Sequence, residues 1–111
     1  MATTSNIFID QGSNYSNIIT VSGTNGAALN LTGYTVASQM RKSYTSTTAY
    51  SLNASIYSAA NGQVRMILTA VQSEAIPPGR YLYDLEITSA SGVKTRVVQG
   101  VATVTAQITQ I

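Results

Sequence analysis

The side chains that could do acid–base or metal chemistry in this chain are its four carboxylates, Asp10, Glu74, Asp84 and Glu86. Asp84 and Glu86 are two residues apart in a segment that alternates apolar and polar residues, so both would lie on one face of a strand. Two carboxylates across a cleft can act as the acid and base of a glycosidase. The alternative is a solvated strand face on which Glu86 lies opposite Arg96, in an ion pair worth at most about 1 kcal/mol. We favour the solvated face.

The rest of the composition argues against catalysis. The chain contains no His and no Cys, and charged residues make up only 9% of its 111 residues, against about a quarter in an average soluble domain. Imidazole bases, thiolate nucleophiles and the common zinc sites are therefore excluded. The sequence has no nucleophile-elbow motif, no phosphate-binding loop and no loop with clustered carboxylates for Ca²⁺. We expect no enzymatic activity, no catalytic residue, no metal ion and no cofactor.

The charge pattern limits the expected partners and location. The formal net charge is only +2 and the basic residues are not clustered, so we expect no binding to nucleic acid or to an anionic membrane. No run approaches the ~20 apolar residues of a membrane span, and the N-terminus shows no export signal. Without Cys there are no disulfides, which fits assembly in a reducing cytosol.

Nearly the whole chain is rich in Val, Ile, Thr and Tyr, alternates apolar with polar residues and has turn residues at short intervals. This pattern is typical of β-strands joined by tight turns. It predicts strands over residues 6–10, 15–22, 28–31, 34–42, 50–57, 63–69, 80–88 and 93–106. Three turns end in a glycine, at Gly26, Gly62 and Gly92, and a three-residue loop with this glycine in the left-handed region aligns apolar faces at all three.

This loop type predicts the register of three hairpins, and a slip by one residue would turn a whole apolar face toward solvent. The predicted pairs are Val21–Leu29, Ile19–Leu31, Ile56–Met66, Ala54–Leu68, Leu85–Val97 and Tyr81–Val101. Residues that share the inward phase are expected in the core: Ile19, Val21, Leu29, Leu31, Val36, Leu52, Ile56, Met66, Leu68, Tyr83, Leu85 and Val97.

Residues 69–79 interrupt the strand pattern. Thr69 can cap a single helical turn, which Pro77-Pro78-Gly79 then ends. A short connection of this kind, directly before a strand with Tyr81 and Tyr83, resembles the corner between the fifth and sixth strands of immunoglobulin-like sandwiches. We therefore expect one all-β domain over residues 1–111, an antiparallel immunoglobulin-like β-sandwich, with a jelly roll as the second choice.

Two segments are candidates for contact with partner proteins. Tyr44, Tyr50 and Tyr57 flank the polar stretch 43–49, and Tyr is favoured at interfaces for its large area and polar tip. At the C-terminus the apolar residues change from odd to even positions near Gly100. Either a bulge there resets the phase within the domain, or residues 103–111 form an arm that lies on a neighbouring subunit. The arm would contact that neighbour through Val104, Ile108 and Ile111.

Several segments resemble the N-terminal domain of phage baseplate upper proteins and related structural proteins of tailed cyanophages. The resemblance covers roughly residues 9–105 and is carried by Leu29-Asn30-Leu31-Thr32-Gly33-Tyr34-Thr35-Val36, Met40-Arg41-Lys42, Ala60-Asn61-Gly62 and Pro78-Gly79-Arg80-Tyr81-Leu82-Tyr83-Asp84-Leu85-Glu86. It implies a β-sandwich that attaches a receptor-binding or fibre component to the virion and has no catalytic residues. Because no fibre follows the last strand, a baseplate, neck or capsid-decoration subunit is equally compatible.

These observations together favour a non-enzymatic virion structural protein of a bacteriophage, assembled in the host cytoplasm. We expect it to act through contacts with other virion proteins and with copies of itself, as part of a symmetric assembly. The alternative is a β-sandwich module that binds a glycan or a host surface, for which Tyr57 and Asn53 offer an aromatic ring and an amide.

Overall fold

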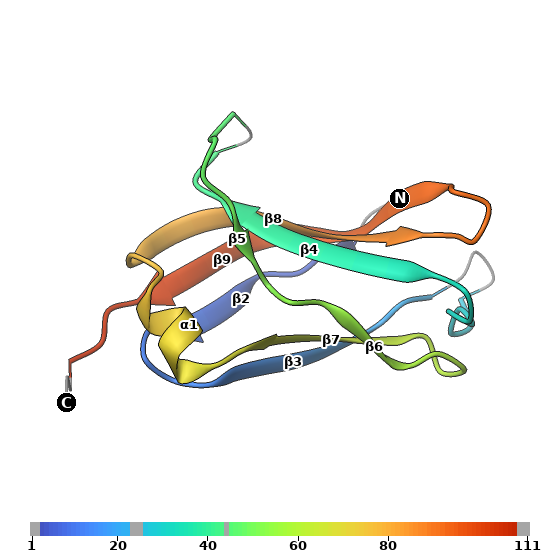
Figure 1. Cartoon of the computed structure of the whole chain (residues 1–111), viewed down its shortest axis with the longest axis horizontal. Helices are drawn as coiled ribbons and strands as arrows, with labels where there is room; N and C mark the ends of the chain where they lie inside the picture. Colours follow the sequence, from blue (N-terminus) through green and yellow to red (C-terminus); the bar gives the residue numbers. More distant parts are fainter. Residues whose placement is uncertain (1–2, 23–25, 44, 109–111) are drawn as a thin grey trace.

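Alternating apolar and polar residues build two β-sheets that pack face to face, with their apolar sides turned toward each other (Figure 1). The computed structural model describes residues 3–22, 26–43 and 45–108. No helix in this described part is long and apolar enough to cross a membrane. Its elements are β1 (Thr3–Thr4), β2 (Ile7–Asp10), β3 (Tyr15–Thr20), β4 (Thr35–Arg41), β5 (Tyr50–Ser51), β6 (Ser55–Ser58), β7 (Gln63–Leu68), α1 (Ala70–Glu74), β8 (Gly79–Thr88) and β9 (Lys94–Thr105).

The larger sheet has the strand order β1-β9-β8-β4-β5, with β2 also paired to β9, and the smaller sheet has the order β3-β7-β6. All pairs are antiparallel except those of β1 and β2 with β9. The orders β3-β7-β6 and β9-β8-β4 correspond to strands B-E-D and G-F-C of an immunoglobulin-like sandwich. The all-β sandwich predicted from the sequence is therefore confirmed, with this topology rather than a jelly roll.

Two of the predicted strands differ from the structure. Residues 28–31 form no strand, because Ala28 makes a single bridge with Ser22 and the Leu31 amide then donates to the Ala59 carbonyl at 2.8 Å. Residues 50–57 form two strands, since β5 pairs with β4 in the larger sheet and β6 pairs with β7 in the smaller one. The chain changes sheet at Asn53, which has a φ of 51°. A sheet change of this kind leaves no trace in an alternating pattern.

The turn glycines adopt the predicted conformation, with φ of 81° at Gly26, 66° at Gly62 and 90° at Gly92. The Val21–Leu29 pairing is also correct, since the Leu29 amide donates to the Val21 carbonyl at 2.9 Å. The Ile19–Leu31 pairing is wrong, because the Leu31 amide donates to the Ala59 carbonyl and Ile19 pairs with Val64 on β7.

The register of the β6–β7 hairpin is displaced. Ile56 pairs with Val64 instead of Met66, Tyr57 has no partner in the ladder, and Ala54 lies outside β6 rather than opposite Leu68. A displacement of two residues keeps Ile56 on the same face, so it still packs against the core.

A bulge sets the register of β8 and β9. Next to the turn Glu86 lies opposite Arg96, as predicted, but the following pair is Leu85–Val98, so Val97 has no partner. The predicted Leu85–Val97 and Tyr81–Val101 pairs are therefore wrong by one residue. Beyond the bulge the even-numbered residues of β9 point inward, and Val98, Ala102 and Val104 are buried. The change of phase seen in the sequence is thus reset within the domain, as the bulge interpretation expected, although at Val97 rather than near Gly100.

The core lies between the two sheets, and all twelve predicted core residues are buried or packed against it. Over its described residues, the structure adds ten further buried apolar residues to this core, nine of them inside strands and one, Ile76, in the loop after α1. They are Ile7, Ile9, Met40, Val64, Ile76, Tyr81, Ile87, Val98, Ala102 and Val104.

The corner between β7 and β8 is built around α1 and Tyr81. Thr69 caps α1 as predicted, and a capping box forms because its hydroxyl accepts from the Gln72 amide while the Gln72 side chain accepts from the Thr69 amide. The buried Tyr81 then donates its hydroxyl to the Pro77 carbonyl, four residues upstream, at 2.6 Å. This is the tyrosine-corner arrangement of immunoglobulin-like sandwiches, and it fixes where the chain crosses from the smaller to the larger sheet.

We predict that Gly62→Ala destabilises the protein more than Gly92→Ala. Both positions have positive φ, which costs a side chain about 1–2 kcal/mol. A Cβ at Gly62 would lie 2.6 Å from the Leu29 carbonyl oxygen and 2.7 Å from that of Val21, whereas one at Gly92 would meet open space. The clash should add about 1–3 kcal/mol to the loss in unfolding free energy, measured by urea denaturation. Equal losses would show that the backbone around Gly62 gives way.

We also predict that Tyr81→Phe lowers the free energy of unfolding by about 0.5–1.5 kcal/mol, because the Pro77 carbonyl loses its donor. Tyr34→Phe is the matched control, since its half-buried ring packs on the core and its hydroxyl bonds to no described residue. The control should change stability by less than about 0.5 kcal/mol. If the two variants unfold at the same urea concentration, the corner hydrogen bond contributes nothing.

Candidate functional site: a groove on the larger sheet

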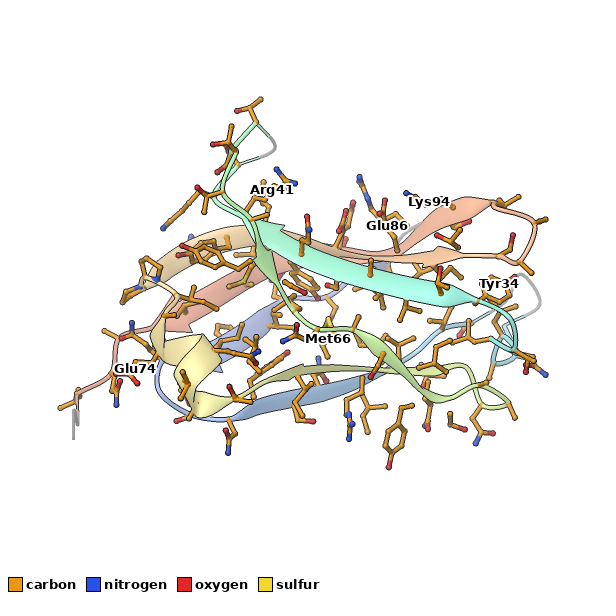
Figure 2. All side chains as sticks on the ribbon, in the orientation of Figure 1. Tyr34, Arg41, Met66, Glu74, Glu86 and Lys94 are labelled. Carbon is orange, nitrogen blue, oxygen red and sulfur yellow. The ribbon has the colours of Figure 1, made fainter. Side chains whose placement is uncertain are left out.

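A groove of about 440 Å³ lies on the outer face of the larger sheet, over β1, β9, β8 and β4. Figure 2 shows Arg41 and Glu86 on this outer side, while Met66 points into the space between the sheets. The groove contains four of the chain's ten charged Lys, Arg, Asp and Glu residues. Its lining residues are Thr4, Asn6, Gln39, Arg41, Ser43, Leu82, Tyr83, Asp84, Glu86, Arg96, Gln99, Gly100 and Val101.

The strand registers order the lining residues into rows. Leu82 lies between Arg41 on β4 and Val101 on β9, which gives the groove an apolar strip with a cation at one end. The next row along the strands is polar and places Asp84 between Gln39 and Gln99. An apolar strip beside converging polar groups is the usual composition of a ligand site.

The groove contains one ion pair, between Arg96 Nε and Asp84 Oδ2 at 3.3 Å. The sequence analysis had paired Arg96 with Glu86. The two residues do lie opposite each other in the ladder, but the long Arg96 side chain leans along the strand toward Asp84, and its Nη1 donates to Gln99 Oε1 at 3.4 Å. The Arg96 side chain is 47% exposed and that of Asp84 32%, so solvent screens the pair and it adds little stability.

Arg41 is held at the other side of the groove by its own hydrogen bonds. Its Nη1 donates to the Ser46 carbonyl at 2.7 Å and its Nη2 to Gln39 Oε1 at 3.3 Å. These contacts tie the end of β4 to the loop that leads to β5. Both arginines of the groove are therefore positioned by protein contacts.

Partial burial in the groove raises the pKa of Asp84 above its usual value of 3.8, and the negative charge of Glu86 raises that pKa further. Arg96 and Arg41 act in the opposite direction without cancelling the rise. The Glu86 carboxylate forms no hydrogen bond or ion pair with any other described residue, although its backbone pairs with β4 and β9. The structure thus places the two predicted carboxylates, Asp84 and Glu86, in the same groove. The Glu86 carboxylate remains available to bind a ligand.

The other acidic residues lie elsewhere. Asp10 on β2 accepts a hydrogen bond from the Thr105 hydroxyl at 2.8 Å and does not line the groove. Over the described ranges, no three His, Cys, Asp or Glu side chains gather where they could hold a metal ion. The geometry of the groove is that of a binding surface for a polar or charged group.

The predicted partner-contact residues fall into different environments. Tyr57 is 55% exposed on β6, with its ring 5.5 Å from the Arg65 guanidinium. Tyr50 is half-buried on β5 and meets the Tyr81 ring edge-on at 5.8 Å. Tyr44 lies outside the described residues. Tyr50 and Tyr57 therefore do not form one surface, because the chain changes sheet between them.

The predicted C-terminal arm is wrong in its first part. Residues 103–105 belong to β9 and pair with β2, and Thr103 and Val104 also pair with β8, so Val104 is buried in the domain's own core. The chain leaves the sheet only after Thr105, and Ile108 is then 98% exposed. Ile111 lies outside the described residues.

The sequence analysis missed a second surface, on the outer face of the smaller sheet. Ile18 on β3 lies opposite Arg65 on β7, Ile67 follows two residues further along β7, and Tyr57 on β6 contacts Arg65 from the other side. We call these four residues the outer patch. Ile18 is 44% exposed and Ile67 37%. The period-two pattern contains the signal, since these apolar residues occupy outward positions.

Comparison of the chain with models of known protein families and with curated protein sequences gives no match.

We predict that Asp84→Asn raises the melting temperature near neutral pH. Because the folded-state pKa of Asp84 is above 3.8, ionisation of this carboxyl costs stability at pH values above that folded pKa. This loss of stability becomes smaller as the pH falls toward 3.8, so the difference in melting temperature between Asp84→Asn and the wild type should shrink over the same range. Thermal unfolding followed by circular dichroism across a pH series measures both effects. A lower melting temperature for the variant at neutral pH would mean that the Arg96 ion pair outweighs burial.

Proposed function

We propose that this protein is a non-enzymatic structural protein of a bacteriophage virion, assembled in the host cytoplasm, that acts through protein–protein contacts. The observation that carries the proposal is the outer patch, where Ile18, Tyr57 and Ile67 surround Arg65 on a sheet face that no described residue covers. Exposed apolar clusters mark interaction sites, and Tyr and Arg are enriched in protein interfaces.

The rest of the molecule supports the same role. Its two thin sheets expose Phe8 on one outer face and the outer patch on the other, so contacts can form on both sides. The absence of His and Cys from the sequence and the low charge leave little catalytic chemistry. The resemblance to baseplate upper proteins supports a place in the tail or baseplate. A neck, fibre-attachment or capsid-decoration position requires the same contact surfaces.

The proposal is tested by locating the protein on particles. Immunogold labelling should place it at a regular position on purified virions. Tyr57→Asp should reduce its incorporation by on the order of tenfold, because a charge at a packed interface costs more than 1.4 kcal/mol. Val71→Asp is the matched control, since Val71 is an exposed apolar residue on α1, outside the patch. Virions without the protein, or equal incorporation of both variants, would contradict the proposal.

The groove favours a second candidate, a module that binds a glycan or a host surface. Its free Glu86 carboxylate, its amides and its apolar strip suit a polar ligand. Tyr57 and Asn53 do not contribute, because Tyr57 lies on the other sheet and the Asn53 side chain is occupied by the Ile67 carbonyl and Gln72. A glycan array separates the candidates. Glycan binding that becomes at least tenfold weaker in Glu86→Ala would support the binding module. If no glycan on the array binds, the virion structural role is favoured.

A further inference from the structure

Strand β3 forms an open edge of the smaller sheet. It pairs with β7 on one side, and within the described part of the chain no strand pairs with its other side (Figure 1). This side of β3 has no partner among the described strands because those that precede it in the sequence, β1 and β2, pair with β9 in the larger sheet instead. An unpaired strand edge presents a row of free amide and carbonyl groups that another strand can bind.

The ladder shows which backbone groups face this open edge. The Val21 amide donates to the Gly62 carbonyl at 2.7 Å, in line with the β3–β7 register. Hydrogen-bonded pairs alternate along an antiparallel ladder, so the odd-numbered residues of β3 bond to β7. The backbone groups of Ser16, Ile18 and Thr20 therefore point away from the sheet, and their side chains lie on its outer face.

The other strand edges carry features that hinder pairing. The edge strand β6 has only four residues, and its pairing with β7 is interrupted at Tyr57. The edge strand β5 has only two residues. The edge formed by β1 and β2 is broken by Ser5 and Asn6, which lie between them. By contrast, β3 has six consecutive residues with no charge, no proline and no bulge. Sheets usually block an exposed edge with one of these devices.

We propose that β3 pairs antiparallel with β3 of a second copy, across a two-fold axis at Ile18. This inference rests on the proposed function, because it names the first contact through which the chain assembles. The pairing places Ile18 opposite Ile18 of the copy and Ser16 opposite Thr20, so an apolar pair is flanked by two hydroxyl pairs. The three residues that face the open edge are those whose hydrogen bonds this register requires.

A second copy fits this edge because the strand is complementary to itself. No charge on β3 repels its copy, whereas a Lys or Asp at position 18 would meet the same charge across the axis. Ile18, 44% exposed in the single chain, gains an apolar neighbour in Ile18 of the copy. The two outer patches then join across one continuous six-stranded sheet, since each Arg65 lies beside its own Ile18.

Charge substitutions at Ile18 test the pairing. Ile18→Lys should halve the mass measured by light scattering coupled to gel filtration and raise the dissociation constant by on the order of 100-fold. Ile18→Glu should do the same, and an equimolar mixture of the two variants should recover the wild-type mass, because Lys then faces Glu. The matched control is Ile67→Lys, on the same face but one strand further in, which should keep the wild-type mass.

A cysteine variant tests the contact without adding charge. The chain has no Cys, so Ile18→Cys introduces a single thiol. In a hydrogen-bonded antiparallel pair the two Cα atoms are about 5.5 Å apart, a spacing that suits a disulfide. Mild oxidation should therefore give a disulfide-linked dimer of Ile18→Cys on a denaturing gel. Ile67→Cys, separated from its copy by both β3 strands, should form no such cross-link.

The results separate this inference from the proposed function. If Ile18→Lys keeps the wild-type mass, or Ile18→Cys fails to cross-link, the pairing is wrong. If those results come with normal incorporation into virions, another segment or protein occupies the edge and the virion role stands. One such occupant would be the C-terminal segment of another copy. Removal of residues 106–111 tests for it, because only in that case would the measured mass depend on these residues. Loss of mass on that truncation, with Ile18→Lys unaffected, would overturn the β3 pairing.

Discussion

A one-residue bulge in the pairing of β8 with β9 determines which side chains of β9 enter the core and which line the groove. Next to the turn, Arg96 lies opposite Glu86, and past the bulge at Val97 the ladder continues with Val98 opposite Leu85. Val98, Ala102 and Val104 consequently enter the core, while Gln99 and Val101 face outward and line the groove. Without the bulge every side chain of β9 after Val97 would change face, because the side chains of a strand alternate.

The same strand also determines where the N-terminus goes. Gly100, on the inner side of β9, allows the backbone at Ser5 to approach so closely that a Cβ at this position would clash with the Ser5 carbonyl. That carbonyl accepts a hydrogen bond from the Tyr83 hydroxyl. This contact holds the segment between β1 and β2 against β9. Because the N-terminal strands are used here, no strand of the described ranges lies beside β3 and the smaller sheet keeps an open edge there.

The two outer faces of the sandwich therefore differ in character. The larger sheet carries a charged groove in which Arg41 and Arg96 are engaged and Glu86 is free. The smaller sheet carries an apolar patch around Arg65, next to an uncharged edge. Opposite faces with different chemistry allow one subunit to contact different neighbours at once, a common requirement in a symmetric assembly. The proposed β3 pairing would use the edge and leave the groove accessible to another molecule.

The sequence alone was sufficient for the local features. Period-two alternation identified the all-β sandwich and twelve core residues; Thr69 and the prolines identified the helical turn at the corner; and the glycines at 26, 62 and 92 identified left-handed turn positions. These features depend on a few neighbouring residues, so their physical causes are contained in short segments.

What only the tertiary structure decided is which strands meet and with what register. The sheet change at Asn53, the unpaired residues Tyr57 and Val97, and the parallel pairing of β2 with β9 arise from contacts between segments far apart in the sequence. An alternating pattern states which residues share a face but not which strand lies beside them, and a one-residue bulge reverses the face without altering composition. For this reason the sequence placed Asp84 and Glu86 on one face, while only the folded structure assigned Arg96 to Asp84 and exposed the edge of β3.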